Sequence, residues 1–152
     1  MADSEPKVPS AADLRMMQIR REMEEMEKRA RIREAEEAKR SAFAHEFLGG
    51  HITEEEREMV RRLVMNAVKE GKLEALVYSF PSELTTDGGR AINSNRPDWP
   101  ETLRGKAREL YDRFEAVGKP AGYKLKAMIV NFPGGVPGDV GLFLNWAPDD
   151  PA

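Results

Sequence analysis

Residues 76–93 read LVYSFPSELTTDGGRAIN, and the rest of the chain is arranged around this stretch. An apolar run ends at Pro81 and opens into a polar segment centred on residues 87–90, Asp-Gly-Gly-Arg. The run over residues 73–80 is apolar on both faces, which is typical of a central strand covered on both sides of its sheet. The stretch therefore predicts a central strand that leads into a polar loop, where a site would lie.

The composition limits the classes of protein that this chain can belong to. Its 152 residues are enough for one ordinary domain and an appendage. The charged fraction of 34% is high and the hydrophobic fraction of 40% is slightly low, which indicates a highly charged segment beside a more ordinary domain. The net charge of −3 provides no positive field, so we predict no nucleic-acid partner and no membrane partner. The absence of cysteine excludes disulfides, thiolate catalysis and sulfur-ligated zinc.

The pattern of residues predicts four segments. These are a disordered lead (1–9), a long charged helix (10–45), a compact α/β domain (46–147) and a tail (148–152). The first ten residues lack the apolar core of a signal peptide, and no run reaches the roughly 18–20 apolar residues of a membrane span. We therefore expect a cytoplasmic protein.

The predicted helix over residues 10–45 contains no glycine or proline, and its apolar residues recur at the 4-3-4-3-4 spacing of a heptad seam. The helix interface predicted from this seam consists of Met16, Ile19, Met23, Met26 and Ala30. One interpretation is a short coiled coil with a partner or with a copy of the same chain. The other is a solvated helix held by i,i+4 pairs of glutamate and arginine. Acids and bases balance along the segment, which disfavours a membrane-surface helix.

The predicted domain begins where Phe43, Phe47 and Leu48 precede two glycines, and we expect the long helix to dock there. Thr53 and Glu56 then form a capping box before an apolar stripe at helical spacing. A second helix is predicted over residues 100–117. Its interior Gly105 indicates close packing against a neighbour.

The predicted order of elements is α-α-β-α-β-β. The strands over residues 73–80 and 123–132 are joined through a helix, so as neighbours they would be parallel with a right-handed crossover. The strand over 140–146 returns antiparallel through a hairpin turn at 133–138. The predicted fold class is α/β, with α+β as the alternative: a small three-stranded mixed sheet with a long N-terminal helical extension.

The connection over residues 81–98 is longer than the roughly 12–15 residues usual for structureless loops, which indicates a function or a missed element. A short edge strand over residues 89–93 is one such element. The loop and the 133–138 turn would share the end of the sheet where α/β proteins bind ligands. The residues predicted to form a ligand or partner surface there are Ser82, Thr85, Thr86, Asp87, Arg90, Asn93 and Asn131.

Two of these residues have both a functional and a structural interpretation. Asp87 is a candidate hydrogen-bond acceptor or base, and Arg90 a candidate clamp for a carboxylate or phosphate. Asp87-Gly88 is equally a favoured turn pair, and Arg90 would then pair with Asp87 or Asp98 to hold the loop. No catalytic set is recognisable, so no residue is assigned a catalytic role.

We assign no metal site and no cofactor. His45 and His51 lie six residues apart with two glycines between them, so they cannot share one helix face as the histidines of metalloproteases do. Residues 133–138 resemble a phosphate loop in composition only, because the lysine and the helix that should follow are absent.

The sequence favours a non-enzymatic interaction and oligomerisation module that associates through its N-terminal helix. The alternative is a small-molecule-binding protein or enzyme that uses the 82–93 loop and the 133–138 turn. A nucleic-acid role would need a basic patch, and the side chains available for it are Arg61, Arg62, Lys69, Lys124 and Lys126.

Overall fold

The computed structural model describes residues 8–149 of the chain. These residues divide into two units, one that ends at Phe43 and one that begins at Ala44, shortly before the predicted start of the domain. Most of the predicted disordered lead and of the predicted tail lies outside the described residues. None of the helices in the described part combines the length and the apolar character that a bilayer-crossing segment needs.

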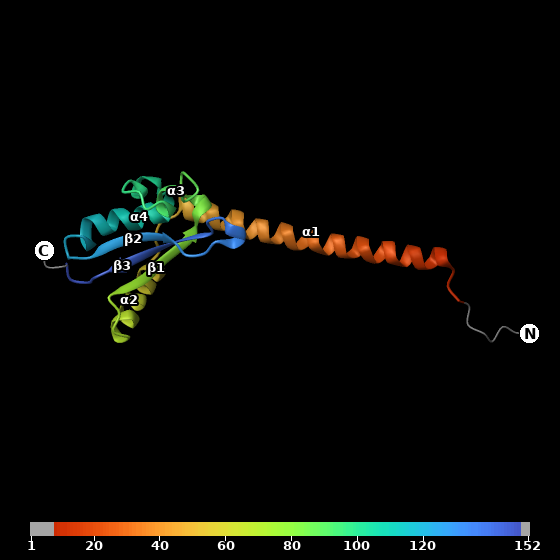
Figure 1. Cartoon of the computed structure of the whole chain (residues 1–152), viewed down its shortest axis with the longest axis horizontal. Helices are drawn as coiled ribbons and strands as arrows, with labels where there is room; N and C mark the ends of the chain where they lie inside the picture. Colours follow the sequence, from red (N-terminus) through yellow and green to blue (C-terminus); the bar gives the residue numbers. More distant parts are fainter. Residues whose placement is uncertain (1–7, 150–152) are drawn as a thin grey trace, which may run out of the picture. The chain divides into compact units, whose positions relative to one another are not determined.

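The N-terminal unit is the first part of helix α1, which runs over Ala11–Gly49 (Figure 1). Its start is capped, because the Ser10 hydroxyl accepts a hydrogen bond from the Asp13 N–H at 3.0 Å and Asp13 Oδ2 accepts one from the Ser10 N–H at 3.3 Å. The one ion pair found among the described residues of this unit is Arg21–Glu25, at 4.0 Å. The long predicted helix is confirmed. Of the i,i+4 pairs of glutamate and arginine that the alternative interpretation requires, the structure shows this one among the described residues of the unit.

The C-terminal unit is built on three strands, β1 (Glu74–Pro81), β2 (Lys124–Ile129) and β3 (Asp139–Asn145). β3 lies between the other two and runs antiparallel to both (Figure 1). The predicted α/β fold, with three strands and a long N-terminal helix, is confirmed. The predicted pairing of the first two strands in a mixed sheet is wrong: β1 and β2 point in the same direction, but β3 separates them.

The connection between β2 and β3 explains this order. The chain reverses through the turn η4 (Pro133–Gly135), and hairpin pairing places β3 along one edge of β2. β1 then pairs with the free edge of β3, which gives a split β-α-β arrangement. β1 is consequently an edge strand and not a central one.

The helices cover one face of the sheet. Ala75, Val77 and Phe80 of β1 are buried on this face, whereas Leu76 is 41% exposed on the other. The register of β1 against β3 shifts between Leu76 and Tyr78, a β-bulge that turns one extra apolar residue toward the covered face. The prediction of a strand covered on both faces is therefore wrong, because the bulge disguises the alternation of a half-covered strand.

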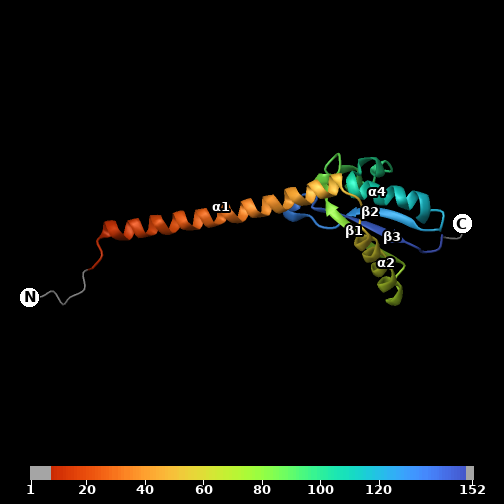
Figure 2. The same cartoon turned by 180° about the vertical axis from the view of Figure 1, so that it is seen from behind.

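Two helices lie on the covered face. α2 (Glu54–Lys69) starts with the predicted capping box, in which Thr53 and Glu56 exchange two hydrogen bonds of 3.1 Å. α4 (Gly105–Arg113) continues into a π-helical turn, η3 (Phe114–Gly118). The two helices start close together and then diverge (Figures 1 and 2).

The larger hydrophobic core joins α4, the last turns of α1 and the sheet. Its buried members are Phe47, Phe80, Leu84, Ile92, Leu103, Ala107, Ile129, Val140 and Leu142. A smaller core joins α2 to the sheet through Ala67, Ala75 and Val77. Within the C-terminal unit, Phe47 stacks on Phe80 with 5.1 Å between ring centroids, while Leu48 is exposed.

Gly105 determines how α4 begins. The predicted helix over residues 100–117 is interrupted, because the turn η2 (Trp99–Thr102) precedes α4 and Gly105 adopts a φ of +56°. A Cβ atom on Gly105 would overlap the carbonyl oxygen of Phe47 and lie 2.8 Å from the Cα of Leu48. The close packing predicted from this glycine is confirmed.

Candidate functional site

The predicted loop over residues 82–93 contains two short helical turns, η1 (Ser82–Leu84) and α3 (Arg90–Asn93). The edge-strand interpretation of residues 89–93 is therefore wrong. Gly89 adopts a φ of +85°, and this left-handed residue turns the chain into α3.

Asp87 holds this turn together. Its Oδ1 accepts the N–H of Gly89 at 3.1 Å and its Oδ2 accepts the N–H of Ala91 at 2.9 Å. Burial by itself would raise the pKa of the Asp87 carboxyl, but hydrogen bonds from the backbone of Ala91 and Gly89 outweigh burial and hold the pKa below its ordinary value. The carboxylate is thus a helix-capping group whose oxygens are turned toward the backbone.

Ser82 joins the loop to the turn that follows β2, as the shared direction of β1 and β2 predicts. Its N–H donates to the carbonyl oxygen of Gly138 at 2.8 Å, and its hydroxyl donates to that of Pro137 at 3.1 Å. The buried Thr85 hydroxyl donates to the Ser82 carbonyl oxygen at 2.8 Å and accepts from the Gly89 N–H at 2.7 Å. These polar groups are satisfied by the chain itself.

The remaining predicted site residues lie in different surroundings. The Asn131 side chain bonds the backbone N–H and the carboxylate of Asp139, at 2.8 and 2.9 Å. Thr86, Arg90 and Asn93 are exposed, and no ion pair of the Arg90 guanidinium is found among the described residues. The geometry favours the structural interpretation for Asp87. The predicted pairing of Arg90 with Asp87 or Asp98 is not found among the described residues, because Asp87 bonds the backbone and Asp98 pairs with Arg96 at 2.9 Å.

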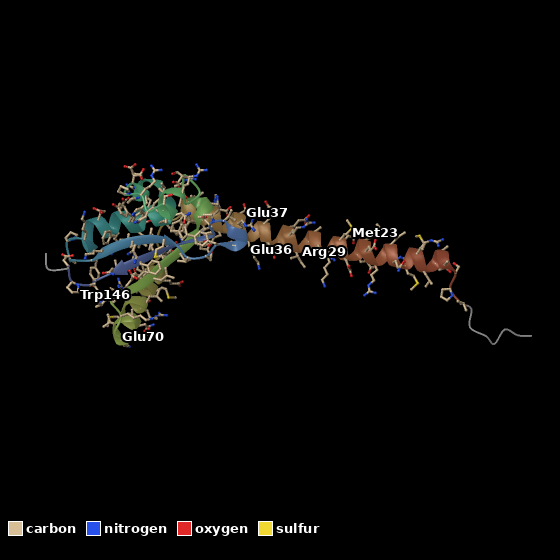
Figure 3. All side chains as sticks on the ribbon, in the orientation of Figure 1. Met23, Arg29, Glu36, Glu37, Glu70 and Trp146 are labelled. Carbon is tan, nitrogen blue, oxygen red and sulfur yellow. The ribbon has the colours of Figure 1, made fainter. Side chains whose placement is uncertain are left out.

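The predicted helix interface is an exposed surface of α1. Met16, Ile19, Met23 and Met26 are 56%, 49%, 56% and 63% exposed, while Ala30 is half-buried. Figure 3 shows Met23, Arg29 and Glu36 projecting from the helix. The predicted interface residues form one apolar seam along α1, and charged residues such as Arg29 and Glu36 lie beside this seam.

A second surface, which the sequence did not reveal, is a groove of about 230 Å³ between α2 and α4. The sheet forms its floor. The apolar side chains that line it include Val60, Val77, Leu110, Phe114, Leu125 and Leu144. We call this feature the α2–α4 groove.

Three arginines, Arg57, Arg61 and Arg113, line the same groove. Arg57 and Arg61 share one carboxylate, Glu54, at 3.4 and 3.8 Å. The Nε atom of Arg57 is shielded from solvent and has no hydrogen-bond partner among the described residues. No ion pair of Arg113 is found within residues 8–149, so positive charge is in excess along the groove.

A buried charged cluster ties together the ends of α2 and α4 that lie close to each other. Lys106 is only 6% exposed, and its Nζ donates to Glu56 Oε1 at 2.8 Å and to Glu46 Oε1 at 3.3 Å. The Tyr78 hydroxyl donates to the other oxygen of Glu56 at 3.2 Å. Because Glu46 lies in the last turns of α1, this cluster links three helices to the sheet.

The contacts within the cluster shift the pKa values of its three ionisable groups. The hydrogen bond to Glu56 raises the pKa of Lys106 despite its burial, so this amine stays protonated at neutral pH. Burial opposes ionisation of Glu56, but the Lys106 hydrogen bond and the backbone of Thr53 lower its pKa overall. Burial, together with the charge of Glu56, raises the pKa of Tyr78 far above its ordinary value. The cluster is therefore a fixed ion pair with a neutral tyrosine.

Sequence reasoning missed Lys106, although a signal was present. Lys106 lies three residues after Leu103 and beside Ala107, so it occupies the apolar face of the predicted helix, where a lysine requires a buried acidic partner. The partner, Glu56, was already identified as a capping residue. Its second role emerges only when α2 and α4 are placed side by side.

The two histidines lie in different surroundings. His51 Nδ1 lies 3.2 Å from Glu109 Oε2, which also accepts the N–H of Ile52 at 3.2 Å, and His45 is exposed. Within residues 8–149, no group of three or more histidine, aspartate or glutamate side chains is arranged to hold a metal ion.

No protein-family model, no curated protein and no solved structure matches this chain. Functional inference therefore rests on the surfaces and charges of the chain itself.

Proposed function

We propose that the protein is an interaction module that self-associates through the apolar seam of α1. The observation that carries this proposal is the row of half-exposed side chains at Met16, Ile19, Met23 and Met26 on a helix of heptad spacing. Burying the exposed half of one such side chain contributes about 1 kcal/mol. Because the seam is short, we expect a weak association that depends on protein concentration.

The lack of other support for the helix strengthens this proposal. Isolated helices in water are marginal even at favourable lengths, and most helices in proteins are stabilised by packing of an apolar face. Between residues 11 and 29 every side chain of α1 is exposed. Association through the seam would supply the missing packing.

The charges beside the seam indicate the orientation of the two copies. With Met16 and Met23 at position a of the heptad, a parallel pair in register would place Arg15 against Arg20 of the other copy and Glu22 against its Glu27. Both contacts join like charges, and only the third contact of this kind, Arg29 with Glu34, joins opposite charges. An in-register parallel pair is therefore disfavoured.

An antiparallel pair with Met23 opposite Met26 of the other copy resolves this conflict. It places Glu22 beside Arg29, and Arg20 beside Glu27. Arg15 then lies beside Glu36, and of the pairs next to the seam only Asp13 with Glu34 joins like charges. We propose this antiparallel arrangement for the self-associated form.

The first experiment measures the mass of the full chain in solution over a range of concentrations. We expect the wild type to form dimers, Met23→Glu to remain monomeric and Met17→Glu to behave as the wild type. Met17 is the matched control because it is 60% exposed on the same helix but lies off the seam. A wild-type chain that stays monomeric at every concentration would refute the proposal.

The second experiment tests the orientation by oxidative cross-linking, for which the cysteine-free chain provides a clean background. In the antiparallel pair, a mixture of Met23→Cys and Met26→Cys chains cross-links far more than either variant alone. Predominant cross-linking of each variant with itself would contradict the antiparallel arrangement and would leave self-association standing.

We further propose a cytoplasmic protein that binds neither nucleic acid nor membranes. The absence of cysteine and the net charge of −3 support this. Lys124 and Lys126 are paired with Asp149 and Glu74, at 2.6 and 2.8 Å, so they contribute little free positive charge. Recovery of the protein in the membrane pellet after cell fractionation, or salt-dependent binding to DNA, would contradict this proposal.

A further inference from the structure

The α2–α4 groove has the apolar composition of a ligand site. Val60 and Leu110 line opposite sides of it, and Val77 and Leu144 come from the sheet below. Its volume of about 230 Å³ lies just below the range of about 300–1,000 Å³ that is common for small-molecule sites. The groove therefore suits a small molecule better than a folded partner.

The charges of the groove select the sign of the ligand. Arg57 and Arg61 share the single carboxylate of Glu54, and Arg113 has no ion pair among the described residues. A buried donor without an acceptor is costly, and Arg57 Nε is such a donor. Because Nε itself is closed to solvent, the acidic head of a ligand would meet the outer guanidinium nitrogens of Arg57, whose side chain is 37% exposed, and those of Arg113.

The acidic residue that lines the groove, Glu56, does not oppose an incoming anion strongly. Its two oxygens are occupied by Lys106 at 2.8 Å and by the Tyr78 hydroxyl at 3.2 Å. The positive charge of Lys106 balances the negative charge of the Glu56 carboxylate. The arginines thus keep a local excess of positive charge in a chain whose net charge is negative.

We propose that the α2–α4 groove binds a small amphipathic anion, with its apolar body on Val60, Leu110 and Leu144 and its acidic head at Arg57 and Arg113. This site is separate from the seam of α1. It assigns the small-molecule role to a place other than the 82–93 loop.

The test compares three eight-carbon probes, octanoate, 1-octanol and octylamine, on the full-length protein. They share one apolar chain and differ in the charge of the head. Binding is followed by NMR through the methyl groups of the protein. We expect octanoate to bind about tenfold more tightly than 1-octanol and octylamine to bind most weakly. The methyl signals of Val60, Leu110 and Leu144 should shift together.

Substitutions separate the charge from the apolar contact. Arg113→Gln should weaken octanoate binding about fivefold and leave 1-octanol binding unchanged. Arg62→Gln is the matched control, because Arg62 is an exposed arginine of α2 that does not line the groove. It should leave the binding of both probes unchanged.

Three results would overturn the proposal. The first is octanoate that binds no more tightly than 1-octanol, or not at all. The second is an equal loss of octanoate binding in Arg62→Gln and Arg113→Gln. The third is probe binding on the open face of the sheet, which would be seen as shifts confined to Leu76, Met128 and Val130, all more than 40% exposed there.

Discussion

Replacing Gly105 by alanine tests the packing of α4 against the last turn of α1. An alanine held at a φ of +56° costs about 1–2 kcal/mol in backbone energy. Its Cβ would also meet backbone atoms of Phe47 and Leu48. These atoms cannot move freely, because the Phe47 side chain is buried in the core and 1% exposed. Overpacking of this kind adds about 1–3 kcal/mol, so we expect a total loss of about 2–5 kcal/mol in the free energy of unfolding.

Gly71→Ala is the matched control for this substitution. Gly71 adopts a φ of +78°, and no atom lies within 4 Å of a Cβ placed on it, so only the backbone cost of about 1–2 kcal/mol applies. The assay is urea unfolding followed through the fluorescence of Trp99 and Trp146, both in the C-terminal unit. Equal losses of stability in the two variants would refute the reasoning, because they would show that the close approach to α1 contributes nothing.

Three further predictions concern the charged and polar clusters. Lys106→Met should lower the free energy of unfolding, measured in the same urea assay, by about 3 kcal/mol because it leaves Glu56 without its buried partner. The control is Lys119→Met, which removes an exposed ion pair and should change the free energy of unfolding by less than about 0.5 kcal/mol. The folded state lowers the pKa of Glu56, so its carboxylate stabilises the protein fully at pH values above the ordinary pKa of 4.5. This stabilisation is lost as the pH falls through the lowered pKa of the folded state. Urea midpoints measured against pH should therefore fall less steeply in Glu56→Gln than in the wild type. Asp87→Ala should lower the free energy of unfolding by about 1–2 kcal/mol because the cap of α3 is lost. Arg90→Ala should change the free energy of unfolding by less than about 0.5 kcal/mol and leave octanoate binding unchanged. A clear loss of octanoate binding in Arg90→Ala would restore the functional interpretation of the loop.

Local features of the fold were predictable because they depend on neighbours in the sequence. The capping box of Thr53 and Glu56, the apolar stripe of α2 and the long α1 all follow from the identity and spacing of nearby residues. The structural interpretation of Asp87 was likewise open from the sequence, since Asp-Gly is a turn pair and the carboxylate reaches N–H groups two and four residues ahead.

Features that depend on distant residues were not predictable in the same way. The insertion of β3 between β1 and β2 requires a choice between sheet edges, and hydrophobic pattern alone does not determine that choice. The bulge beside Val77 made a half-covered strand resemble a fully buried one. The α2–α4 groove combines Arg57 and Arg61 of α2 with Arg113, which follows more than 50 residues later, so no local pattern indicates it.

The central position of β3 has a consequence for how the domain is made. β1 and β2 each form their sheet hydrogen bonds with β3, which follows both of them along the chain. During synthesis, β1 is made with neither edge paired, and more than 60 further residues must be added before β3 is complete. α2 can pack on β1 earlier and shield its apolar face, but the backbone groups that β1 later pairs with β3 stay open to other chains until β3 has been made and has left the ribosome.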